Sequence, residues 1–67
     1  MTLSARNRLK GTVETVERDG LVARVVIRVG DARVESLITR QSADDLKLAP
    51  GDAVTAVVKA TEVMVEK

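Results

Sequence analysis

A chain of 67 residues with a net charge of +1, no His, no Cys and no aromatic residue excludes several kinds of protein. It cannot form disulfides, offers no ring on which nucleic acid bases stack, and has only short apolar stretches where a bilayer requires about 20 residues. We therefore expect a single domain over residues 1–67, with no nucleic acid partner and no membrane partner. The lack of Cys and of an apolar signal-peptide core predicts a cytoplasmic protein.

The small size of the domain has a consequence for its stability. A chain of this length buries a limited fraction of its surface, so its core contributes little stability by itself. Neither disulfides nor clustered metal ligands are present to reinforce it, and we expect no metal site. Oligomerisation is the remaining means of stabilisation, and it is predicted here.

The N-terminal part of the chain has the pattern of two strands. Apolar and polar side chains alternate over residues 9–14, and Val16 falls out of that alternation, which predicts a bulge or bend near Glu14–Thr15. Arg18–Gly20 predicts a turn in which Gly20 takes a positive φ. The clearest strand is Leu21–Val29, in which Leu21, Ala23, Val25, Ile27 and Val29 share one face.

The second face of this strand is half apolar, because it carries Val22 and Val26 between arginines. Two interpretations fit these valines. They contact another subunit, as so small a core would favour, or they are ordinary exposed valines.

The C-terminal half alternates strand signals with one short helix. Gly30–Asp31 leads into a third strand, Ala32–Thr39, after which Ser42 is predicted to cap a short helix. Ala49-Pro50-Gly51-Asp52 predicts a turn. Strands are then expected over residues 54–61 and 62–65. The predicted fold is all-β, a small five-stranded OB-like Greek-key barrel with one short helix between strands 3 and 4; an open five-stranded sheet is the alternative.

The side chains that remain for chemistry do not favour catalysis. No serine has a histidine to activate it, and a Ser–Lys pair would require a buried, uncharged Lys59. Asp44 and Asp45 are adjacent on the predicted helix and point in different directions. We expect no catalytic residue and no enzyme activity.

Hydroxyls, fixed positive charges and helix N–H groups are the donors that a tetrahedral oxyanion requires. Ser42 and Thr39 lie near the predicted helix start, Arg6 lies in the N-terminal segment and Lys59 on a strand. Each residue also has a structural explanation. Ser42 is explained as a cap, Thr39 as a strand end, and the two cations as exposed surface residues.

Four segments of the chain resemble the molbindin (Mop) family of molybdate-binding domains. They are Ser4-Ala5-Arg6-Asn7 followed by Leu9 and Gly11, then Leu37-Ile38-Thr39-Arg40-Gln41-Ser42, Leu48-Ala49-Pro50-Gly51-Asp52, and Val58-Lys59-Ala60-Thr61-Glu62-Val63. The resemblance covers essentially the whole chain, at the spacing of one Mop unit.

The resemblance implies a protein that binds molybdate or tungstate without transforming it and that needs no cofactor. The oxyanion ligands it implies are Ser4, Arg6, Thr39, Ser42, Lys59 and Ala60, the last through its backbone N–H. It also implies a hexamer, a trimer of dimers, with oxyanions bound between subunits.

Three functions are compared on this basis. The first is intracellular molybdenum storage and homeostasis, and the second is a regulatory or interaction module like the oxyanion-sensing domains of molybdate transporters and regulators. The third, a nucleic-acid-binding OB barrel, is disfavoured by the absence of aromatic residues and the near-zero net charge.

Overall fold

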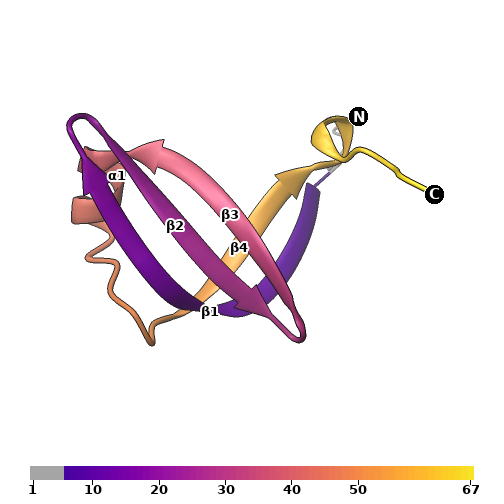
Figure 1. The fold of residues 1–67 in the computed structure, drawn as a ribbon, viewed down its shortest axis with the longest axis horizontal. Helices are drawn as coiled ribbons and strands as arrows, with labels where there is room; N and C mark the ends of the chain where they lie inside the picture. The colour runs from indigo at the N-terminus through magenta and orange to yellow at the C-terminus, as the bar shows by residue number, and fades with distance from the viewer. Residues whose placement is uncertain (1–5) are drawn as a thin grey trace, which may run out of the picture.

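A computed structural model describes residues 6–67 as one curved antiparallel sheet with a short helix at one end (Figure 1). The elements are β1 (Arg6–Asp19), β2 (Val22–Val29), β3 (Ala32–Thr39), α1 (Arg40–Asp45), β4 (Ala53–Lys59) and the 3₁₀ helix η1 (Ala60–Glu62). The strand order in the sheet is β3-β2-β1-β4. No helix in the described part of the chain is long and apolar enough to cross a membrane.

Strand β1 organises the sheet because it pairs with two neighbours in succession. Its first half, Arg6–Thr12, pairs with β4, and its second half, Thr12–Asp19, pairs with β2. The change of partner requires a bend at which backbones approach closely. A Cβ on Gly11 would lie 2.5 Å from the backbone oxygen of Arg28, so only glycine fits there. The predicted bulge is confirmed by a register shift between Val13 and Thr15.

The core lies on the concave side of the sheet. Val13, Val25, Ile27 and Ala56 form its buried centre. The predicted inner face of the second strand is thus confirmed except at Leu21, which lies in the turn before β2 and is 88% exposed. On the other face Val26 is only 8% exposed, so it is buried within its own chain, whereas Val22 is 41% exposed.

The helix begins earlier than predicted, and its cap is a different residue. Thr39, and not Ser42, is the N-cap of α1: its backbone is extended and its side-chain oxygen accepts a hydrogen bond from the Ser42 N–H. The prediction was wrong because strand and helix are contiguous, which leaves no loop before Ser42. Lys47 ends the helix in the left-handed conformation, with φ of 52°.

The last predicted element is also different in the structure. Strand β4 ends at Lys59, and the chain turns through η1 where residues 62–65 were predicted to form a fifth strand. A strand forms only where the backbone of a neighbouring strand supplies hydrogen bonds. Alternation of apolar and polar side chains does not by itself provide such a neighbour. The described residues therefore form an open four-stranded sheet, in an all-β fold with the helix between strands 3 and 4 as predicted.

Candidate functional site

The six predicted oxyanion ligands divide into two groups. Arg6, Lys59 and Ala60 lie where β1 begins and β4 ends, and we call this the basic end. Thr39 and Ser42 lie at the junction of β3 and α1, which we call the capped end. Ser4 lies outside the described residues, so its place in the site stays a prediction.

At the basic end two cations face each other across the sheet. Arg6 and Lys59 are Cα partners in the antiparallel ladder between β1 and β4, and directly opposite residues point to the same face. No carboxylate of the described residues lies within 4.0 Å of either side chain's nitrogens. Like charges placed opposite each other repel, so this pair would gain from an anion bound between them.

Two further cations continue this row. Arg8 and Lys10 follow Arg6 at alternate positions of β1, and alternate residues of a strand share a face. All three side chains are exposed. A row of positive charges therefore continues from the basic end along the first half of β1.

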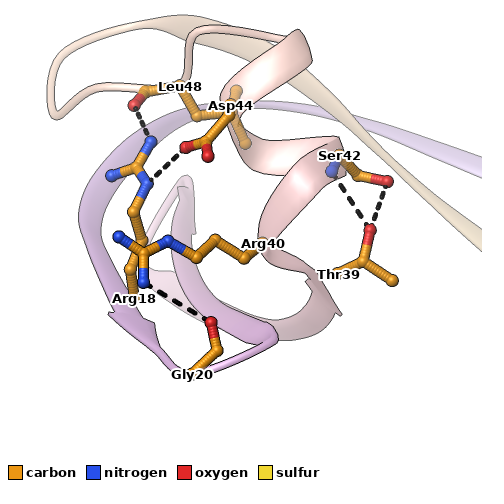
Figure 2. Close-up of polar contacts among 7 residues, drawn as sticks. All are labelled: Arg18, Gly20, Thr39, Arg40, Ser42, Asp44 and Leu48. Carbon is orange, nitrogen blue, oxygen red and sulfur yellow. Dashed lines mark hydrogen bonds and ion pairs between the residues drawn. The ribbon is translucent and has the colours of Figure 1, made fainter.

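At the capped end the two hydroxyls are hydrogen bonded to each other. The Thr39 hydroxyl donates to Ser42 Oγ at 2.7 Å, and Thr39 Oγ1 accepts from the Ser42 backbone N–H at 3.1 Å (Figure 2). Both residues are exposed. The pair thus presents oxygens that an anion could reach, and it also completes the first turn of the helix.

Arg18 holds the helix against β1, a role that the sequence analysis missed. Its Nε donates to an Asp44 carboxylate oxygen at 2.8 Å, and its guanidinium reaches the Leu48 carbonyl at 3.5 Å (Figure 2). The backbone N–H of Arg40 donates to the Leu21 carbonyl at 2.8 Å. The one signal in the sequence was an arginine directly before the predicted Asp19-Gly20 turn, which does not indicate its partner.

Exposed apolar side chains surround the capped end. Val22 is the Cα partner of Thr39, and Leu37 is two residues before Thr39 on the same face of β3. Leu37 is 71% exposed, and Leu21 adds a further exposed leucine in the adjacent turn. Apolar residues grouped in this way are typical of a surface that another chain covers.

The arginines between the two ends are already neutralised by glutamates. Glu14 accepts a hydrogen bond from Arg33 Nε at 3.0 Å and lies 3.7 Å from Arg28 Nε. The hydrogen bond from Arg33 holds the pKa of the Glu14 carboxyl below its ordinary value. Arg24 is paired with Glu35, which raises the pKa of its guanidinium. These arginines therefore have less to gain from an external anion than Arg6 and Lys59.

The basic end and the capped end lie far apart in one chain. Figure 1 shows α1 at one end of the longest axis and the start of β1, with η1, at the other, and the molecule is 34 Å long on that axis. Hydrogen bonds to an oxyanion are about 2.7–3.2 Å long, so one small anion cannot reach both groups in the same chain. A site that uses all the predicted ligands requires at least two chains.

This chain is similar to known proteins over nearly its whole length. A family model described as the TOBE domain matches residues 3–65. Molybdenum-pterin-binding protein 3 of Clostridium pasteurianum is 42% identical over 66 residues, which cover 97% of each chain. A molybdate-binding protein from Sporomusa ovata has a solved structure that superposes with a TM-score of 0.90, at 42% identity and with full coverage of both chains.

One further relative is much longer than this chain. The molybdenum transport protein ModE of Herbaspirillum seropedicae is 45% identical over 96% of this chain, which corresponds to 24% of ModE. The same unit therefore also occurs as part of larger proteins.

Proposed function

Because this chain belongs to the TOBE domain family, and within it to the small molybdenum-pterin-binding (Mop) proteins, we propose that it binds molybdate or tungstate as an intact oxyanion. The observation that carries this proposal is the Arg6–Lys59 pair, two cations that face each other without an acidic partner among residues 6–67. A dianion between them would neutralise both charges. The backbone N–H of Ala60, next to Lys59, is the third predicted donor at this end.

The site is proposed to form between subunits of a homo-oligomer. Arg6, Lys59 and Ala60 come from one chain, and Thr39 and Ser42 from a neighbour whose capped end abuts the basic end. The exposed apolar residues around Thr39 support such a contact. A hexamer built as a trimer of dimers, as in the Mop family, would supply repeated copies of this interface.

The bound ion is held and released, and no bond of it is broken. None of the described hydroxyls has a histidine to activate it, since the chain contains no His. The proposed role is cytoplasmic molybdenum storage and homeostasis. The relation to ModE supports a second candidate, a regulatory or interaction module that senses the same oxyanion.

Isothermal titration with molybdate in sulfate-containing buffer tests the proposal, with the oligomer mass measured on the same sample. Tight binding to a hexamer that excess sulfate does not displace is the expected result. An absence of binding heat, together with a melting temperature that ignores saturating molybdate, would refute it, because a ligand that binds only the folded state must stabilise that state.

A further inference from the structure

A second pair of cations lies on the sheet face that carries Arg6 and Lys59. Arg28 and Arg33 are Cα partners in the antiparallel ladder between β2 and β3, so their side chains point to the same face. Thr12 is the β1 partner of Arg28 and is separated from Arg6 by an even number of residues, so both pairs share one face. The side chains of Arg28 and Arg33 are 51% and 60% exposed. The sheet therefore has two cross-strand cation pairs on one exposed surface.

A single carboxylate group neutralises the second pair. Glu14 Oε2 accepts a hydrogen bond from Arg33 Nε at 3.0 Å and lies 3.7 Å from Arg28 Nε. No other carboxylate of residues 6–67 lies within 4.0 Å of either guanidinium. Because like charges on opposite residues repel, one oxygen of Glu14 offsets a repulsion between two arginines.

The bulge in β1 gives Glu14 this position. Pairing with β2 passes from Val13 to Thr15, so Glu14 has no Cα partner on that strand. A bulge re-aims the side chain of the residue that it leaves unpaired. Arg33 lies on β3, two strands from β1, and its side chain reaches across β2 to meet the carboxylate. The irregularity in β1 thus places an acidic group between two arginines that belong to other strands.

The two cation pairs differ in their counter-ion. The pair at the basic end has no carboxylate partner among the described residues, whereas Arg28 and Arg33 share Glu14. Guanidinium groups present several N–H donors that match the oxygens of a tetrahedral anion. An open hollow of about 480 Å³ beside Arg33 is lined by Glu14 and by Thr15, which adds a hydroxyl. Without the charge of Glu14, this pair would therefore attract a tetrahedral anion from solution.

We propose that Arg28 and Arg33 form a second anion site, that Glu14 is its built-in ligand, and that Glu14 thereby keeps sulfate off this face. Sulfate has the charge and shape of molybdate, and an exposed arginine pair has no enclosed cavity with which to select an anion by size. A tethered carboxylate competes well with a free ion because its effective concentration is high. The selectivity for molybdate rests on the proposed function; the closing of the arginine pair does not depend on it.

Sulfate binding to the variant Glu14→Gln tests the proposal. The substitution keeps the shape of a side chain that is one third exposed and removes its charge. Equilibrium dialysis against radiolabelled sulfate at low ionic strength counts the anions bound to each chain. The variant should bind several times more sulfate than the parent chain, and the gain should disappear at high ionic strength because the site is exposed.

Glu17→Gln is the matched control, because it removes the same charge from the same strand. Its partner Arg24 keeps Glu35, so no arginine loses its only carboxylate. This control should bind no more sulfate than the parent. The double variant Glu14→Gln/Arg33→Ala should lose the gain, since one arginine of the pair is then missing.

Three results would overturn the proposal. The first is a Glu14→Gln variant that binds no more sulfate than the parent chain. The second is an equal gain in Glu17→Gln, which would show a general effect of net charge. The third is a gain that persists without Arg33, which would place the anion elsewhere on the surface.

Molybdate titration of the parent and of Glu14→Gln separates this inference from the proposed function. Molybdate binding by both proteins without a gain in sulfate binding discards the second anion site and leaves the oxyanion function standing. A gain in sulfate binding by Glu14→Gln, with no molybdate binding by the parent, supports the closed arginine pair and counts against the oxyanion function.

Discussion

The basic end and the capped end of this molecule are built in opposite ways. At the capped end the polar side chains are paired within the chain: Thr39 and Ser42 are hydrogen bonded to each other, and Arg18 pairs with Asp44. At the basic end Arg6 and Lys59 face each other, with no acidic partner among the described residues. The capped end therefore stabilises the chain, whereas the basic end has a repulsion that a ligand would relieve.

This difference suggests that stability and binding are separable in this protein. Substitutions at the basic end should change affinity and leave the fold intact, and those at the capped end should change stability first. The following predictions test that division, in order of decreasing expected effect.

The largest effect is expected from Arg6→Ala and Lys59→Ala. Each removes a charged donor, which is worth about 1.5–3 kcal/mol and corresponds to a roughly tenfold or greater loss of molybdate affinity. Without ligand, the melting temperature should stay the same or rise, because the repulsion is gone. Titration and thermal melts measure the two quantities. Lys10→Ala removes the same charge from the same strand and is the control; unchanged affinity in both site variants would place the oxyanion elsewhere.

Thr39→Ala should have the next largest effect, this time on stability. It removes the N-cap of α1 and leaves the Ser42 N–H without its acceptor, at a cost of about 0.5–2 kcal/mol. Urea unfolding of the chain without ligand measures this cost. Thr39→Ser keeps the oxygen and should recover most of the loss, so equal destabilisation by Ala and Ser would show that the hydroxyl is not the source.

A smaller loss is expected from Asp44→Asn, which breaks the ion pair with Arg18. Both partners are partly exposed, so the pair contributes about 0.2–1 kcal/mol, and less at high salt. Unfolding in low and high salt measures the loss. Asp45→Asn, on the next residue of the same helix, is the control, and a loss that is identical in both variants or insensitive to salt would contradict the assignment.

The smallest effect concerns Glu14, between the two ends. Its pKa is lowered in the folded chain, so its contribution to stability is complete above the ordinary pKa of a glutamate and is lost as the pH falls through the lowered value. The variant Glu14→Gln should therefore flatten the acid limb of the stability curve and leave its shape near neutral pH unchanged. Identical acid limbs for Glu14→Gln and the parent chain would contradict this prediction.

Local patterns in the sequence predicted most of the elements correctly. Alternation located the strands, and the misfit of Val16 located the bulge. The Pro50-Gly51 turn is confirmed, with Gly51 at a φ of 94° and the Asp52 N–H donating to the Ala49 carbonyl. These features depend on the conformational preferences of neighbouring residues, which is why they could be read from the chain.

Predictions that depended on a distant partner were less successful. Thr39 and Ser42 are both residue types that cap helices well. Thr39 is the cap because β3 stays paired with β2 as far as Thr39, and the helix begins at the next residue. Residues 62–65 alternate like a strand, yet no edge of their own chain receives them. The separation of Thr39 from Lys59 was likewise beyond the sequence, because local patterns carry no information about distances across the fold.

The sequence by itself determined the all-β class, the turns and the lack of His and Cys, because these follow from residue chemistry and local backbone preference. The candidate oxyanion ligands were named from the resemblance to the Mop family. Only the tertiary structure decided that Arg6 and Lys59 face each other, that the candidate ligands occupy opposite ends of one chain, and that the sheet stays open between β3 and β4. Those properties arise from strand pairing between distant segments, and pairing depends on which edges meet.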